Sequence, residues 1–226
     1  MDIRVKICGI SSEAILEHAI GLGADYVGFV FFARSPRAVS PERAGELART
    51  AGVRARKVGV FVDPDDSFLE QVLHHAPLDI LQLHGSETPA RVAEIRRRFG
   101  VDVMRAIKVS DGADLKSADD YLGVADRLMF DAKAPASLVG AMPGGNRVSF
   151  DWTLLAGRRW SLPWMLSGGL DPDNVAEALR ISGASEVDVS SGVEEGPGRK
   201  DPRLIAAFIA AAKGTSVDSL RTRRAS

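Results

Sequence analysis

Short runs of apolar residues recur along the chain, and amphipathic stretches separate them. The runs are rich in Val and Ile, which is typical of strands buried on both faces of a parallel sheet. Eight of them lie at residues 3–8, 26–32, 57–62, 79–84, 103–109, 127–131, 164–168 and 186–190. Signals for helix starts lie between several of these runs, at residues 11–13, 40–42, 65–67, 171–173 and 201–202. The pattern therefore predicts repeated strand–helix units.

The sixth unit interrupts this pattern. Residues 132–159 contain Gly140, Pro143, Gly144, Gly145 and Gly157. Because glycine and proline punctuate regular structure, we expect most of this stretch to be loop. A turn or two of helix is expected only near residues 151–153.

The number and order of the units favour one closed domain. Eight strands, each followed by a helix-like segment and with no linker between halves, predict a single (β/α)8 TIM barrel over residues 1–213. An open, doubly wound sheet is the alternative. Residues 214–226 begin with a glycine, hold few apolar residues and contain three arginines, so we expect a flexible C-terminal extension there.

Composition and charge narrow the class of partners. The chain has 226 residues, 45% of them hydrophobic and 26% charged, and its 29 Lys and Arg nearly balance its 30 Asp and Glu. A balanced charge gives no field that would attract nucleic acid. No apolar run is long enough to cross a bilayer, and the first residues do not resemble a signal peptide. We therefore expect a cytoplasmic protein with no nucleic-acid or membrane partner.

Cysteine usage and motifs argue against a metal or redox cofactor. Cys8 is the only cysteine, so an internal disulfide framework and a cysteine-rich zinc site are excluded. The sequence also lacks an HExxH motif and a phosphate-binding loop of the GxxxxGK[ST] type. We expect neither a metal nor a nucleotide cofactor.

Polar residues gather where the predicted strands end. In a barrel of this type the active site lies at the carboxyl ends of the strands. The candidates at these ends are Cys8, Arg37, Gln82, His84, Asp131, Gly168, Gly169, Ser190, Ser191 and Gly192. Side chains alternate along a strand, so Val5 and Ile7 face the helices while Lys6 and Cys8 face the barrel interior. Cys8, which could be simply a small buried apolar residue, thus joins a polar ring.

Two glycine-containing loops are candidates for phosphate binding. Residues 167–171 follow the seventh strand and residues 190–194 follow the eighth. Barrels of this type often bind phosphate at these two loops through backbone N–H groups. A single Gly-Gly pair is a common turn, but two such loops on adjacent final strands favour a phosphate site.

Three side chains each have two interpretations. Arg37 is either a solvated loop residue or a bidentate clamp for a carboxylate. Asp131 either forms a structural salt bridge, with Lys133 as its candidate partner, or works as an acid/base pair with the thiol of Cys8. His84 either carries a proton or hydrogen-bonds the following loop.

An ordered set of motifs resembles the phosphoribosylanthranilate isomerase family of tryptophan biosynthesis. The set is KICGI, GFVFFARSPR, VGVFVD, LQLHG, MFDAK, FDW, LSGGL and VDVSSGVEEGPGRKD, between residue 3 and about residue 212. The resemblance implies a cofactor-free Amadori rearrangement of N-(5-phosphoribosyl)anthranilate to 1-(2-carboxyphenylamino)-1-deoxyribulose 5-phosphate. It further implies Cys8 as general base, Asp131 as general acid, Arg37 as the carboxylate-binding residue and the two glycine-containing loops as the phosphate site.

Two details go beyond the resemblance. A cysteine base needs a nearby positive charge to lower its pKa, and we expect Lys6 to supply it from a position between Cys8 and Asp188. In the loop before Phe150 the family usually shows Gly-Gly-Thr-Gly, whereas this chain has Asn146 and Arg147 after its two glycines. The path of that loop is therefore expected to differ.

Two other functions remain as alternatives. One is the related aminoaldose isomerase of histidine biosynthesis, a reaction usually assigned to two carboxylates, against which the thiol argues. The other is a phosphosugar-binding barrel without catalysis, because fold alone does not fix function. We expect a monomer, with a homodimer as the alternative.

Overall fold

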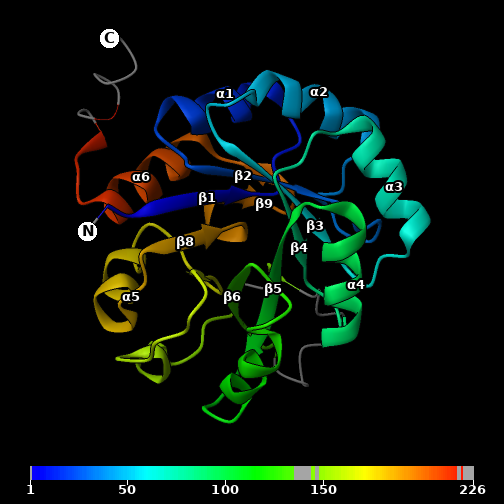
Figure 1. Cartoon of the computed structure of the whole chain (residues 1–226). Coiled ribbons are helices and arrows are strands. Elements are labelled where there is room, and N and C mark those ends of the chain that lie inside the picture. The colour runs from blue at the N-terminus through cyan, green and yellow to red at the C-terminus, as the bar shows by residue number, and fades with distance from the viewer. Residues whose placement is uncertain (1, 135–143, 146–147, 218–219, 221–226) are drawn as a thin grey trace.

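The protein, seen here as a computed structural model, is a closed barrel of eight parallel strands in sequence order (Figure 1). The structure describes residues 2–134, 144–145, 148–217 and 220. The barrel strands are β1 (Arg4–Cys8), β2 (Tyr26–Val30), β3 (Arg56–Phe61), β4 (Ile80–Leu83), β5 (Asp102–Val109), β6 (Arg127–Ala132), β7 (Trp164–Leu166) and β8 (Glu186–Val189). The predicted TIM barrel is thus confirmed, and the open sheet is wrong because β1 pairs with β8.

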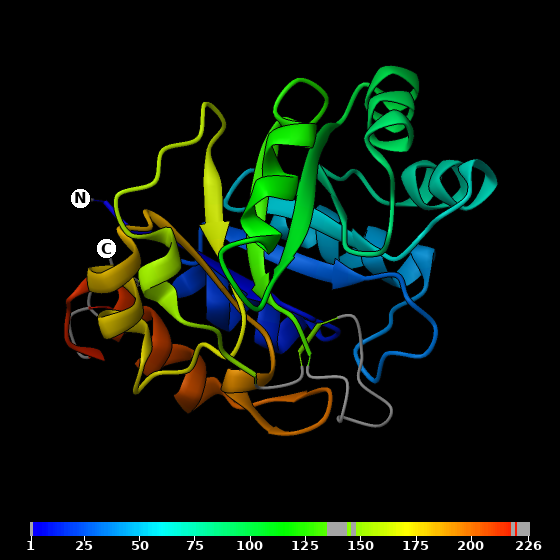
Figure 2. The same ribbon diagram turned by 90° about the horizontal axis from the view of Figure 1, so that it is seen from below.

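Helices surround the strands, with α3 and α4 on one flank and α5 and α6 on the opposite one (Figures 1 and 2). The helices are α1 (Glu13–Gly21), α2 (Pro41–Ala51), α3 (Asp66–His75), α4 (Pro89–Phe99), α5 (Val175–Ser182) and α6 (Pro202–Lys213). The side chains of Ser12, Ser40, Asp65, Thr88 and Asp201 cap five of them by accepting backbone N–H groups. These caps fix where each loop from a strand end turns into its helix.

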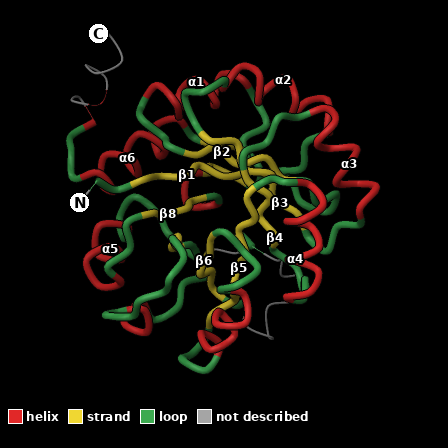
Figure 3. Tube along the Cα trace, in the orientation of Figure 1, coloured by secondary structure: helices red, strands yellow, loops and turns green. Residues whose placement is uncertain are grey.

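Two units lack a full α-helix. A 3₁₀ helix, η1 (Asp114–Tyr121), follows β5. The sequence pattern did not predict that this segment is a 3₁₀ helix. Between β6 and β7 the described residues form only η2 (Trp152–Leu155) and loop, as Figure 3 shows between β6 and α5. The rings of Phe130 and Trp160 pack at a tilt, with centroids 4.4 Å apart, and Trp160 also contacts Trp164. These aromatic rings cover the outer side of β6 and β7.

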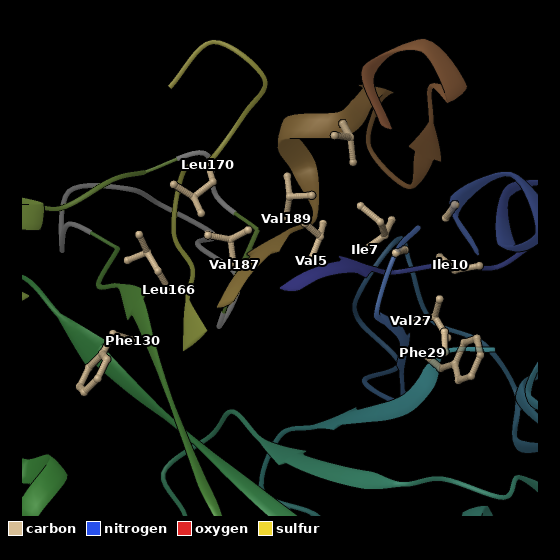
Figure 4. Close-up of a cluster of buried hydrophobic side chains, with 14 of the residues drawn as sticks. Val5, Ile7, Ile10, Val27, Phe29, Phe130, Leu166, Leu170, Val187 and Val189 are labelled. Atoms are coloured by element: carbon tan, nitrogen blue, oxygen red, sulfur yellow. The ribbon is translucent and has the colours of Figure 1, made fainter. Parts of the chain in front are cut away.

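Alternation along the strands separates an outer core from an inner one. Val5 and Ile7 of β1 are fully buried against the helices, together with outward residues of the neighbouring strands (Figure 4). The barrel interior holds a separate apolar layer of Tyr26, Val58, Ile80, Met104, Ala106, Met129 and Met165. Lys6, which is the register partner of Tyr26, also lies inside the barrel and has no solvent exposure. The inner apolar layer closes the barrel below the polar ends of the strands.

A short hairpin follows the barrel and precedes α6. A three-residue 3₁₀ turn, η3 (Ser191–Val193), leads into β9 (Glu194–Gly196), which pairs with β10 (Arg199–Lys200). The hairpin, orange in Figure 2, lies at the end of the barrel toward which the β7 arrow points. Sequence reasoning did not predict this hairpin.

Two segments that the sequence predicts to be irregular, the loop before Phe150 and the C-terminal extension, are described only in part. Asn146 and Arg147 lie outside the described residues, as do most residues of the extension from 214 to 226. Helix α6 ends at Lys213 with a left-handed glycine at 214. Within the extension, Val217 and Leu220 pack against the outer core. None of the described helices is long and apolar enough to cross a membrane.

Candidate active site

One cavity opens at the carboxyl ends of the barrel strands. It encloses about 710 Å³, including its open mouth, which is in the range of small-molecule sites. The predicted site residues on its wall are Cys8, Arg37, Gln82, His84, Asp131, Gly168, Gly169, Ser190 and Ser191. Gly192 does not line the cavity. It lies against the loop after β7, where an added Cβ would be 1.9 Å from the Leu170 carbonyl oxygen.

Glycines on both sides of Cys8 explain its place at the end of β1. Gly9 has a φ of 79°, and an added Cβ there would lie 2.7 Å from Cδ of Arg37. The glycine therefore lets the Arg37 side chain cross directly behind the thiol residue. On the neighbouring strand, a Cβ at Gly28 would lie 2.9 Å from Sγ of Cys8. Both glycines provide space, one for the arginine and one for the sulfur.

Lys6 lies between Cys8 and Asp188, as expected. Its Nζ donates to Asp188 Oδ1 at 2.7 Å, and Ser167 Oγ donates to Asp188 Oδ2 at 3.0 Å. Burial raises the pKa of the Cys8 thiol; the Lys6 ammonium opposes this, and Asp188 reinforces it. Lys6 thus lowers the thiol pKa, as expected, but desolvation outweighs its contribution and leaves the pKa of Cys8 above its ordinary value.

We expect Lys6→Met to raise the pKa of the Cys8 thiol further. The substitution removes the adjacent cation and leaves the negative charge of Asp188 close to the sulfur. Titrating the ultraviolet absorbance of the thiolate measures the pKa, with Cys8→Ser as the blank. Asp188→Asn is the matched variant with the opposite expected effect: it removes a negative charge and should lower the thiol pKa. Equal thiol pKa values in all three proteins would reject this electrostatic coupling.

Asp131 lies at the end of β6 in contact with two other polar side chains. Its Oδ2 accepts from Lys108 Nζ and from His84 Nε2, each at 2.9 Å. The suggested salt bridge with Lys133 is wrong, since Lys133 donates to Asp114 instead. Burial alone would raise the pKa of Asp131, but the Lys108 cation and the His84 hydrogen bond outweigh it and hold the pKa well below its ordinary value.

His84 is held between Gln82 and Asp131. Gln82 Nε2 donates to His84 Nδ1 at 2.7 Å, so Nδ1 is the acceptor and Nε2 carries the proton donated to Asp131. Burial, reinforced by the nearby Lys108 charge, lowers the pKa of His84 below its usual value. The ring is therefore neutral, and it orients the carboxyl group of Asp131 toward the cavity.

Arg37 is neither solvated nor unpaired. It is 7% exposed, and it donates from Nε to Glu194 Oε1 and from Nη2 to Glu194 Oε2, each at 2.8 Å. One edge of the guanidinium is thus already bound to a carboxylate. The opposite corner, Nη1, lies beside Gly145 on the cavity wall. A ligand carboxylate can be bound only at this remaining edge.

The loops after β7 and β8 pack tightly against each other and the cavity. Gly168 has a φ of 93°, and an added Cβ there would lie 2.4 Å from the Ala132 nitrogen. Within the described residues, the backbone N–H groups of Gly168 and Gly169 donate to no protein acceptor. Free N–H groups on a cavity wall are suited to bind an anion such as phosphate.

Sequence reasoning missed four features of the site. Lys108 was not considered, although it is the penultimate residue of the predicted strand that precedes the strand of Asp131. Glu194 and Lys200 were quoted only as part of a motif, although glycine and proline between them indicate a turn. The fourth feature is an apolar wall of Val30, Phe32, Val60 and Val62. Alternation along two strands and the residues that follow them was the available signal for that wall.

The described residues contain no group of three His, Cys, Asp or Glu side chains arranged to hold a metal ion. The cavity wall also carries two groups that can exchange a proton, the Cys8 thiol and the Asp131 carboxyl, and the guanidinium of Arg37, which can bind an anion.

Comparisons with known proteins give one consistent result. Residues 5–211 match the family model described as N-(5'phosphoribosyl)anthranilate (PRA) isomerase. A protein of Paramagnetospirillum magneticum with the name N-(5'-phosphoribosyl)anthranilate isomerase is 60% identical over 214 residues, which cover 95% of this chain and 99% of the relative.

Solved structures agree. The phosphoribosyl anthranilate isomerase of Thermotoga maritima has a TM-score of 0.83 at 37% identity and covers 94% of this chain and 99% of its own. A further structure, of such an isomerase in complex with reduced 1-(o-carboxyphenylamino)-1-deoxyribulose 5-phosphate, has a TM-score of 0.79 at 35% identity, with the same coverage.

Proposed function

The chain belongs to the N-(5'-phosphoribosyl)anthranilate isomerase family, enzymes of tryptophan biosynthesis, and from that premise we propose how its own residues carry out the isomerisation. The substrate is N-(5-phosphoribosyl)anthranilate and the product is 1-(2-carboxyphenylamino)-1-deoxyribulose 5-phosphate. The observation that carries the mechanism is the shared cavity, in which Cys8 and Asp131 lie with Arg37 and the loops after β7 and β8.

Substrate orientation follows from the two anion-binding ends. The phosphate binds the N–H groups of Gly168 and Gly169 and the adjacent Ser190–Ser191 segment. The anthranilate carboxylate binds the free edge of Arg37, and the aromatic ring packs on the apolar wall of Val30, Phe32, Val60 and Val62. Holding both ends places the sugar between the two proton-transfer groups. This positioning lowers the activation barrier by several kcal/mol.

The first step opens the sugar ring. Asp131 gives its proton to the ring oxygen, the bond between C1′ and this oxygen breaks, and the nitrogen lone pair forms the C=N bond of a Schiff base. The pKa of Asp131 is low although the residue is buried. We infer that turnover uses the minor protonation state of the pair, in which Asp131 holds the proton and Cys8 is ionised.

The second step moves a proton from carbon. The Cys8 thiolate takes the proton from C2′, the C–H electron pair forms the C1′=C2′ bond, and the C=N electrons return to nitrogen. The resulting enolamine tautomerises to the aminoketose. General acid and general base catalysis each contribute about 10² to 10⁴ in rate.

The fluorescence of the substrate provides the test. Purified protein is mixed with N-(5-phosphoribosyl)anthranilate, and the loss of substrate fluorescence is followed over time. We expect turnover. Turnover only of the aminoaldose substrate of histidine biosynthesis would favour that isomerase, and binding of both compounds without turnover would favour a non-catalytic barrel.

Two further expectations stand as part of this proposal. We place the enzyme in the cytoplasm, where a single free cysteine stays reduced. We expect a monomer in solution, with a homodimer as the alternative, and sedimentation equilibrium distinguishes the two.

A further inference from the structure

Three buried charged side chains meet beside the cavity, one of them far from the other two in the sequence. Arg37 comes from the loop after β2, Glu194 begins β9 and Lys200 ends β10. Their side chains are 8%, 2% and 2% exposed, respectively. Burying charges is costly unless they are paired. Such a cluster next to a ligand cavity therefore calls for a functional explanation.

Glu194 is shared between the two cations. Its Oε1 accepts from Arg37 Nε at 2.8 Å and from Lys200 Nζ at 2.7 Å. Its Oε2 accepts from Arg37 Nη2 at 2.8 Å and from the backbone N–H of Gly198 at 3.2 Å. Arg37 and Lys200 outweigh burial and lower the pKa of Glu194, which is therefore ionised.

Lys200 also connects this cluster to the end of β8. Its Nζ donates to the Ser190 carbonyl oxygen at 2.9 Å and to Ser190 Oγ at 3.3 Å. With Glu194, these are three acceptors for the three N–H donors of an ammonium group. Ser190 Oγ in turn donates to the Cys8 carbonyl oxygen at 3.2 Å. The ammonium group of Lys200 thus links Glu194, the carboxylate partner of Arg37, to the end of β8.

The charge balance of the cluster depends on Lys200. Arg37 and Glu194 alone form a neutral pair, and a ligand carboxylate brought to the free edge of Arg37 would also approach the negative charge of Glu194. With Lys200, the three described side chains of the cluster carry a net charge of +1, from two cations and one anion. Favourable potential at the free edge of Arg37 therefore requires the buried lysine.

We propose that Lys200 is a positioning and specificity-determining residue, whose charge neutralises Glu194 so that Arg37 can bind the carboxylate of the substrate. This inference rests on the proposed function, in which Arg37 is the carboxylate-binding residue. Lys200 itself does not touch the carboxylate; it acts through Glu194.

The test compares two ligands that differ only in the carboxylate. The first is reduced 1-(o-carboxyphenylamino)-1-deoxyribulose 5-phosphate, and the second is its phenylamino counterpart. Dissociation constants are measured by calorimetry for the wild type, Lys200→Met, Lys200→Arg and the double variant Glu194→Gln/Lys200→Met. The dissociation constant of the phenylamino ligand divided by that of the carboxylated ligand measures how much the carboxylate strengthens binding.

We expect Lys200→Met to reduce this ratio by about tenfold, equivalent to about 1.4 kcal/mol, with little change for the phenylamino ligand. Lys200→Arg keeps the charge and most of the ratio. The double variant removes both charges, leaves Arg37 as a lone cation, and recovers the ratio. Because it contains no unpaired carboxylate, the double variant also remains informative if Lys200→Met does not fold.

Two results would overturn the inference. If Lys200 is merely structural, Lys200→Met will weaken the binding of both ligands by the same factor. The double variant will then bind both ligands more weakly than the single variant does. If the wild type itself shows no preference for the carboxylated ligand, the assignment of Arg37 in the proposed function fails, and the inference fails with it.

Discussion

Asp131→Asn is expected to lower kcat by about 10² to 10⁴ with little change in KM, because the amide cannot supply the proton that opens the sugar ring. The shape of the side chain is kept, so His84 and Lys108 still face it and substrate still binds. Steady-state kinetics from the loss of substrate fluorescence measures both constants.

The matched control is Asp114→Asn. Asp114 is also a hydrogen-bonded aspartate with a lowered pKa, of about 2, but it pairs with Lys133 and does not line the cavity. The control should keep kcat near the wild-type value. If Asp131→Asn retains kcat within tenfold of the wild type, the ring oxygen receives its proton from another source.

Cys8→Ser is expected to lower kcat by a similar factor, about 10² to 10⁴, since a serine hydroxyl is far too weak an acid to supply the base. The thiolate form is required, and the pKa of Cys8 is raised by burial. Turnover also needs protonated Asp131, whose pKa is low. The wild-type rate should therefore be flat with pH between the two pKa values and should fall once the pH exceeds the pKa of the thiol, which the pH–rate profile of kcat measures.

Alkylation provides an independent check on the thiol. Cys8 is the only cysteine, so a thiol reagent modifies one position. Iodoacetamide should inactivate the wild type, more slowly when the reduced product analogue is bound. Wild-type turnover by Cys8→Ser, or by the fully alkylated enzyme, would remove Cys8 from the mechanism.

The barrel and its polar interior could be predicted because alternation along a strand is a local property. Val5 and Ile7 had to meet the helices, which put Lys6 and Cys8 inside. The same reasoning placed His84 and Asp131 on the interior face, where they form a hydrogen bond. Residues at strand ends come together in any closed parallel barrel, whatever their separation in the sequence.

The pairing of particular charged side chains could not be predicted, because it depends on the register between strands and on the paths of the loops. Asp131 pairs with Lys108 since β5 and β6 align these two residues as neighbours. Lys133 lies beyond the end of β6 and turns to Asp114 instead. Arg37 and Glu194 are separated by 157 positions, and their contact depends on the path of the β9–β10 hairpin. No local pattern encodes such pairings.

The central claim is that one bound substrate reaches both Cys8 and Asp131 while its two anionic ends are fixed. A crystal structure with reduced 1-(o-carboxyphenylamino)-1-deoxyribulose 5-phosphate tests it most directly. We predict phosphate on Gly168 and Gly169, carboxylate on Arg37, and Sγ and the carboxyl oxygen each about 3 to 4 Å from the sugar atoms they act on. A ligand bound in the reverse direction, or a sugar beyond the reach of either group, would contradict the account.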